Sequence, residues 1–293
     1  MNTTEEKVNL TIRELKEWFE KPNRKEKDYL GVISEIKKMS EEEKIRKSIV
    51  NQFEYLDIWY GNNFVYEMLT KEISSSKRDL ITNGYYTLYI SDILAEISPN
   101  NPPSPMFDKA SWWLSNCLIQ KWYKESKELV DIINKGLNTK FLKGGLNFKT
   151  AAWFIIELVN KCFDNIVDYT QFNYPEDMGV YQVAINNWNT KDLNLVDSIV
   201  SNLCNYHLLQ ASYGDVSESA GYNDPMFLQF STTRWFVYAF EILTWLRVRE
   251  KYGLKNPSLF THPLMHLPLN QLSVEDMPFS ENKLFNLIIK KLK

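Results

Sequence analysis

The chain has 293 residues, which fits one large or two ordinary domains, and its hydrophobic share of 44% is enough for a sizeable core. With 10 Gly and 11 Pro, its composition excludes the disordered and collagen-like classes. Its net charge of −3 comes from 34 Lys and Arg against 37 Asp and Glu. Nucleic-acid binders show a basic excess because they neutralise phosphates, so we expect no nucleic-acid partner.

Apolar residues recur at steps of three and four along most of the sequence, and this spacing predicts helices. The first helix should stop before Pro22. Ser40 stands three residues before Glu43 in a capping-box pattern, which predicts that a new helix begins there. The tyrosine-rich stretch 85–90 could form a strand, but the wider apolar spacing favours a helix. In this part, the predicted helices cover Thr4–Phe19, about Arg24–Met39, about Ser40–Ile73 and Asp79–Ile97.

Residues 98–105 are the clearest break in the chain, because four prolines in eight residues exclude a helix and stiffen the connector. They separate an N-terminal helical part, residues 1–97, from a C-terminal helical part, residues 106–293, which we expect to pack closely on the first. Gly144 and Gly145 predict a turn within the second part. The helices predicted there cover Phe107–Tyr123, Ser126–Leu137, Lys149–Tyr169, about Glu176–Trp188, Asp192–Ala211, Thr232–Tyr252 and Glu281–Leu292.

The predicted fold class is all-α. Short connections favour antiparallel neighbours, so we expect antiparallel helical hairpins stacked as an irregular bundle or a short solenoid. The tryptophans fall on no fixed period, and a regular repeat is therefore not supported.

Three histidines limit what imidazole chemistry the chain could perform. His207 continues the apolar stripe of its predicted helix, so it is either a hydrogen-bonded core histidine or a buried general base. His262 and His266 form the sequence His-Pro-Leu-Met-His, whose spacing on a helix would place both rings on one face. A zincin needs glutamate where Pro263 stands, and proline opposes a long regular helix. We therefore expect no metal site.

Other catalytic patterns are weak or missing. Glu157, Asp164 and Asp168 form a stripe on the predicted helix Lys149–Tyr169 that could hold a divalent ion. The opposite face is apolar, however, so the simpler interpretation is that the stripe is the solvent-exposed side of this helix. The sequence contains no nucleophile elbow, P-loop or Rossmann glycine motif. We expect no catalytic residues, no cofactor and no enzyme activity.

The cysteines and the N-terminal residues indicate a compartment. Cys117, Cys162 and Cys204 are odd in number, form no CxxC pair and lie in apolar helical stretches, as buried free thiols do. A disulfide framework is not expected, and a reducing compartment fits best. The first ten residues contain no apolar signal core, and no run of eighteen apolar residues occurs. We therefore expect a cytoplasmic protein without a membrane partner.

A long irregular segment, residues 212–225, joins two strongly helical stretches, and long loops of this kind are often functional. It mixes tyrosines with acidic residues. Tyrosine is enriched at interface hot spots, and acidic rims steer basic partners, so we predict a contact patch for a protein partner. A second irregular acidic stretch, 174–179, could lie beside it; the alternative is an ordinary solvated loop. The predicted partner-binding residues are Tyr213, Asp215, Glu218, Tyr222, Asp224, Glu176 and Asp177.

The C-terminal region supports a comparison at the level of a family. A predicted helix closes with Arg247-Val-Arg-Glu-Lys-Tyr252, and the segment Gly253–Leu269 reads Gly-Leu-Lys-Asn-Pro-Ser-Leu-Phe-Thr-His-Pro-Leu-Met-His-Leu-Pro-Leu. Together with the helical layout, this last fifth of the chain resembles the all-helical immunity proteins that protect bacteria from polymorphic and secreted toxins. The resemblance implies a cytoplasmic, non-enzymatic and mildly acidic protein that occludes a toxin's active site. It transfers no residue-by-residue functional pattern.

The leading hypothesis from the sequence is therefore a protein-binding module that neutralises a partner, most simply a cognate toxin domain. One alternative is a helical enzyme with a buried site built from His207 and carboxylates. Another is a helical scaffold that binds a peptide.

Overall fold

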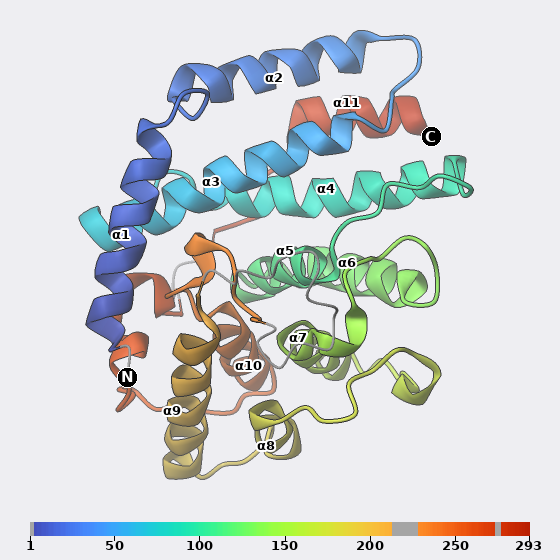
Figure 1. The fold of residues 1–293 in the computed structure, drawn as a ribbon. Helices are drawn as coiled ribbons and strands as arrows, with labels where there is room; N and C mark the ends of the chain where they lie inside the picture. The colour runs from blue at the N-terminus through green and yellow to red at the C-terminus, as the bar shows by residue number, and fades with distance from the viewer. Residues whose placement is uncertain (1–2, 213–227, 273–276) are drawn as a thin grey trace.

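The computed structural model describes residues 3–212, 228–272 and 277–293 (Figure 1). Within these residues the fold is all-α, as predicted, and the β-type pairing consists of two isolated bridges, Met106 with Lys143 and Ala211 with Phe230. No helix in these ranges combines the length and the apolar character needed to cross a membrane. The helices are α1 Thr4–Glu20, α2 Glu26–Glu41, α3 Ile49–Lys71, α4 Lys77–Ile97, α5 Phe107–Ile119, α6 Tyr123–Gly136, α7 Thr150–Cys162, α8 Val180–Asn186, α9 Leu193–Gln210, α10 Phe240–Lys251 and α11 Lys283–Leu292.

The helices form an irregular bundle of stacked layers (Figure 1). The long antiparallel pair α3 and α4 has α2 and α11 on one side and α5 on the other. Helix α10 packs on both α5 and α7, and the short α8 joins α7 to α9 at the far side of the molecule. Helix α1 runs across the edge of these layers, from α3 towards α9. One hydrophobic core extends through all the layers.

A buried polar cluster joins the two parts of the chain that the proline-rich residues 98–105 separate. Asp57 of α3 is 1% exposed. Its Oδ1 accepts the indole N–H of Trp113 on α5 at 2.8 Å, and its Oδ2 accepts from Nη2 of Arg234 at 3.0 Å. Arg234 belongs to a 3₁₀ turn, η3, and crosses α3 at Gly61, where a Cβ atom would come within 2.6 Å of its Cδ. The acidic side chain thus holds α3, α5 and the segment before α10 together.

The capping box predicted at Ser40 is wrong. Helix α2 continues through Ser40 to Glu41, and α3 begins only at Ile49. Ser40 is buried, and its hydroxyl donates to the Lys37 carbonyl at 2.6 Å. A serine hydroxyl can bond back to the preceding turn as readily as it caps a following helix, so the pattern alone does not decide between the two.

The helix predicted over Lys149–Tyr169 is also too long. Helix α7 ends at Cys162, and Asp164 adopts a positive φ of 54°. The Asn165 N–H then donates to the Asn160 carbonyl at 2.9 Å, and the Asp164 N–H donates to the Lys161 carbonyl at 3.1 Å. These two bonds form a Schellman cap, which usually places glycine where aspartate stands here. Because of this cap, the predicted carboxylate stripe does not lie on one helix.

Helices α8 and α10 begin after their predicted starts, and helix α5 ends before its predicted end. Helix α8 starts only after Gly179, whose φ is +55°. Helix α10 starts at Phe240, because the side chain of Asn270 accepts the Ala239 N–H at 2.9 Å and donates to the Val237 carbonyl at 2.8 Å, which holds this stretch out of the helix. Helix α5 stops at Ile119. The turn at Gly144–Gly145 is confirmed by positive φ values at both glycines.

Candidate partner-binding groove

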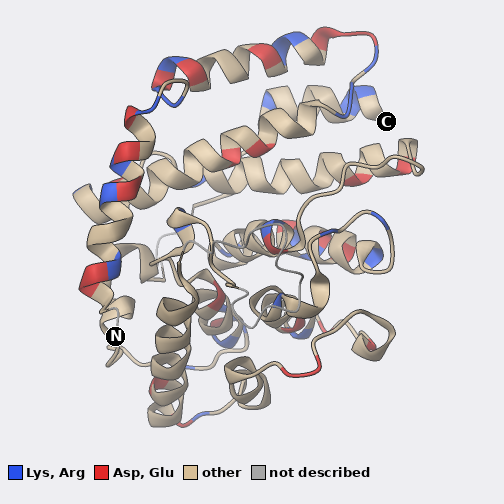
Figure 2. Ribbon diagram, in the orientation of Figure 1, with Lys and Arg blue, Asp and Glu red and all other residues tan. Residues whose placement is uncertain are grey.

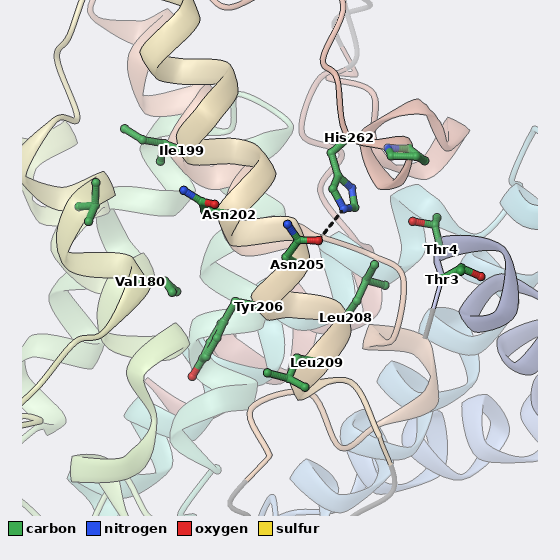
Figure 3. A pocket seen from close by; sticks show the side chains of 12 residues that line it. Thr3, Thr4, Val180, Ile199, Asn202, Asn205, Tyr206, Leu208, Leu209 and His262 are labelled. Carbon is green, nitrogen blue, oxygen red and sulfur yellow. Dashed lines mark hydrogen bonds between the residues drawn. The ribbon is translucent and has the colours of Figure 1, made fainter. Parts of the chain in front are cut away.

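A groove of about 770 Å³ lies between α8 and α9 (Figure 3). Helix α8 contributes Val180 and Val183 to one wall. The opposite side is formed by His262 and Pro263, with Thr3 and the first residue of α1 nearby. Three segments that are far apart in the sequence therefore build one surface feature.

Helix α9 forms the floor of the groove. Asp192 caps its first turn by accepting the N–H groups of Asn194 at 2.9 Å and Leu195 at 3.3 Å. One face of the helix is buried in the core, including Val196, Val200, Leu203, Cys204 and His207. The opposite face presents Asn202, Asn205, Tyr206 and Leu209 to the groove, at the three- and four-residue steps that keep side chains on one side of a helix.

Two large apolar side chains of the groove are unusually exposed. Leu209 of α9 has 72% of its surface exposed, and Val183 of α8 has 51%. Tyr206 is half-buried, and its ring contacts that of Tyr181 in α8 edge to face, at a centroid distance of 5.6 Å. The groove therefore offers apolar area that a bound partner could remove from water.

His262 attaches its own side of the groove, which it forms together with Pro263, to α9. Its Nδ1 accepts the Leu264 N–H at 3.1 Å and caps the 3₁₀ turn Pro263–His266. The proton must then sit on Nε2, which donates to Oδ1 of Asn205 at 3.3 Å. Burial lowers the pKa of His262, and the neighbouring His266 lowers it further. Both effects favour the neutral form of the His262 imidazole.

The second histidine of the His-Pro-Leu-Met-His sequence also bonds to the main chain. His266 Nε2 donates to the Phe260 carbonyl at 2.6 Å. Just before this turn, the N–H and the hydroxyl of Thr261 donate to the two carboxylate oxygens of Asp197 on α9, at 2.8 and 2.6 Å. In the described ranges, His, Cys, Asp and Glu residues do not gather into a group of three that could hold a metal ion.

The segment that leads into α8, on one side of the groove, is acidic. Between Lys161 and Lys191 the chain has no basic residue, whereas four acidic residues occur in the irregular segment that leads to α8 (Figure 2). Glu176 and Asp177 are both exposed there. Burial raises the pKa of Tyr206, and the Asp177 carboxylate raises it further. Asp177 stands three residues before Val180, which lines the groove. The four acidic residues are Asp164, Asp168, Glu176 and Asp177.

Two of the predicted partner-binding residues, Glu176 and Asp177, are exposed and stand a few residues before Val180, which lines the groove. The Asp177 Oδ1 accepts the Gly179 N–H at 2.7 Å, which fixes the entry into α8. The remaining five lie outside the described residues, namely Tyr213, Asp215, Glu218, Tyr222 and Asp224. The groove residues themselves were missed from the sequence. The one available signal was the pair Leu208–Leu209, since adjacent residues on a helix point about 100° apart and both cannot face the core.

The predicted carboxylate stripe has a different role. Glu157 is buried in α7 and accepts a hydrogen bond from the Tyr174 hydroxyl. Burial raises the pKa of Glu157, although Tyr174 and Lys161 oppose the rise. Asp164 lies in the αL position of the helix cap, and its Oδ1 accepts the Tyr252 hydroxyl at 3.0 Å. Asp168 caps a 3₁₀ turn by accepting the Thr170 N–H. The three carboxylates thus serve three separate local contacts.

His207 is a core histidine. The ring is fully buried, its Nε2 lies 2.8 Å from the Trp235 carbonyl and its Nδ1 lies 2.8 Å from Oε1 of Glu241. Because a carbonyl only accepts, Nε2 must carry a proton. The ring also stacks on Phe230 at a centroid distance of 4.0 Å. Both His207 and Glu241 have no exposed surface, so a substrate could reach them only after the core had opened.

The three cysteines are free and buried. Burial raises the pKa of the Cys162 thiol to about 11, although the Lys251 ammonium lowers it. Reactive cysteines need a thiolate, and burial disfavours it here.

Residues of the segment 247–269 hold the side of the groove that His262 and Pro263 form in place. Arg249 is fully buried and donates to the Trp188 carbonyl at 3.1 Å, the Thr190 carbonyl at 2.9 Å and the Lys255 carbonyl at 2.8 Å. Its Nε also donates to Oδ1 of Asn256 at 2.9 Å. The guanidinium fork therefore ties the end of α10 to the start of α9 and to the segment that leads to His262. Burial lowers its pKa.

Comparisons with known proteins add no relative: the chain matches no family model, no curated protein and no solved structure.

Proposed function

We propose that the protein captures a basic protein partner and neutralises it, as toxin-immunity proteins do. The observation that carries this proposal is the juxtaposition of an acidic segment with an exposed apolar groove. Leu209 and Val183 supply the apolar area, and Glu176 and Asp177 supply the charge. The resemblance of residues 247–269 to bacterial immunity proteins supplies the class of partner, a cognate toxin domain.

The two parts of this surface would act at different stages of binding. Exposed acidic groups attract a basic partner over a Debye length of about 8–10 Å and raise the association rate. Apolar side chains that become buried at the centre of an interface mainly slow dissociation. Neutralisation would then follow from occlusion, because a bound protein covers the partner's own active site and needs no catalytic group of this chain.

The first test is protection. A partner is isolated from the native host and expressed alone in a test bacterium, with and without this chain. We expect the partner to stop growth and co-expression of this chain to restore it. A partner that is harmless when expressed alone, or that remains toxic despite a stable complex, would contradict neutralisation.

The second test separates the acidic segment from general charge. The double variant Glu176→Lys, Asp177→Lys should slow association about tenfold at low salt and flatten its salt dependence. The matched control is Glu41→Lys, Glu43→Lys, which changes the net charge equally. Both control residues are exposed near the end of α2, at the opposite side of the bundle from α8 and α9 (Figure 1). Equal association rates for the two double variants would place the interface elsewhere.

A further inference from the structure

We propose that the groove between α8 and α9 binds an extended segment of the partner polypeptide, in which a large apolar residue lies close to a lysine or arginine. This inference rests on the proposed function and names the kind of ligand that the groove recognises. A volume of about 770 Å³ lies in the range of about 300–1,000 Å³ that is usual for ligand pockets, so it suits a few residues of a chain better than a protein surface.

The argument for an extended segment comes from two asparagines. Asn202 and Asn205 lie one turn apart on the groove face of α9 (Figure 3). The amide nitrogens of both side chains donate no hydrogen bond to any described residue, and the Asn205 Oδ1 is already oriented by His262. A primary amide offers two donors and one acceptor, which matches the N–H and C=O groups of a peptide unit.

A helical ligand would not use these amides. In a helix the main-chain groups bond to one another, whereas an extended chain leaves them available, which is why extended peptides are often bound through main-chain hydrogen bonds. An apolar groove without such amides would serve a helix equally well. The two asparagines therefore favour the extended form.

The argument for the side chains comes from the groove walls. Leu209 and Val183 are the exposed apolar groups, and the Tyr206 ring lies between α8 and α9, so one large apolar side chain would bury area on all three. The Asp177 Oδ1 accepts the Gly179 N–H at 2.7 Å, next to Val180 of the groove wall. Exposed Glu176 precedes it, and no basic residue of this segment neutralises the two carboxylates. A cation on the ligand would meet this pair, and an anion would be repelled.

The experiment uses the whole protein and synthetic fluorescein-labelled peptides of about six residues, which span about 20 Å when extended. One peptide has leucine and lysine in a serine–glycine background, the second has leucine and glutamate, and the third has alanine and lysine. A fourth repeats the first with esters in place of the main-chain amides, which removes the N–H donors and weakens the C=O acceptors. We expect fluorescence polarisation to show the first bound about tenfold more tightly than each of the others. Equal affinities, or no saturable binding of the first peptide, would overturn the inference.

Two variants assign the binding to the groove. Asn202→Ala should weaken the leucine–lysine peptide about fivefold and the ester peptide less. Leu209→Ser should weaken the leucine peptides but not the alanine peptide. Both residues are exposed, so the variants should fold as the original does, which circular dichroism checks. Peptide affinities that neither variant alters would place the binding outside the groove and overturn the inference.

The outcomes also separate this inference from the proposed function. A partner that is neutralised as before by both variants would leave the function standing and remove the groove from it. Peptide binding with the expected selectivity, but without growth protection by the protein, would leave the groove standing and remove neutralisation.

Discussion

Replacing Asp57 by asparagine removes the carboxylate that Arg234 contacts in the core, at 3.0 Å. The substitution keeps an oxygen for the Trp113 indole N–H but leaves the guanidinium, which is 2% exposed, without its counter-charge. Burial already lowers the pKa of Arg234, and the Asp57 carboxylate is the first group that opposes this. Removing one member of a buried ion pair costs about 3–5 kcal/mol. We therefore expect Asp57→Asn to lower the free energy of unfolding by about 3 kcal/mol.

The assay is urea unfolding followed by tryptophan fluorescence, which also reports on Trp113. The double variant Asp57→Asn, Arg234→Met removes both charges, and apolar replacement of a buried pair is often close to neutral. We expect the double variant to be more stable than Asp57→Asn alone, although it contains one more substitution. A loss below about 0.5 kcal/mol for Asp57→Asn, or simple additivity in the double variant, would refute the argument that this pair joins the two parts of the chain.

Two further predictions concern a close helix contact and a titrating cap. Gly84→Ala on α4 would place a Cβ atom 2.6 Å from Cδ1 of Trp113 and should destabilise the protein by about 1–3 kcal/mol. Gly31→Ala in α2, where the added Cβ would have no packing neighbour within 4 Å, should stabilise the protein by about 0.5–1 kcal/mol. Urea unfolding of both variants tests the pair, and equal effects would contradict the contact. The pKa of His262 in the folded state lies below the usual imidazole value of about 6.5, so the unfolded chain binds a proton first as the pH falls below that value, and stability is lost there. His262→Asn retains a capping oxygen without the titration, so it should lose less stability than the original protein between about pH 7.5 and 5.5; equal losses would exclude His262 as a contributor.

The sequence predicted the fold class because the core depends on local apolar spacing. Helices such as α4 and α9 were found close to their true bounds for this reason. The errors occurred where a side chain chose between two local bonds, as Ser40 does, or where a residue other than glycine took the αL position, as Asp164 does. The late start of α10 has a third cause, because the Asn270 side chain bonds to the preceding main chain from 31 and 33 residues away.

The candidate site was predicted only in part, and the reason is again physical. The sequence singles out Glu176 and Asp177 because they form an acidic stretch without basic residues, and their role in binding stays a prediction. The groove could not be found, since its walls are brought together by the long-range bonds of Arg249, Asp197 and His262. No periodic pattern encodes which carbonyls a buried arginine will reach.

The arrangement of the first and last helices has a consequence for how the chain acquires its structure. Helix α1 packs on η3 and reaches Ala211 through the Lys7 ammonium, while α11 returns to α2 and α4, where Asn286 accepts the Tyr86 hydroxyl at 3.0 Å. Each end of the sequence is thus completed by the opposite half. Contacts between such distant residues require large loops to close and slow folding. During synthesis, α1 can pack on α3 early, but the surface that contacts η3 and Ala211 stays exposed until those residues have emerged. We expect a nascent chain with a prolonged need for chaperone protection, and a protein that does not tolerate being divided at residues 98–105.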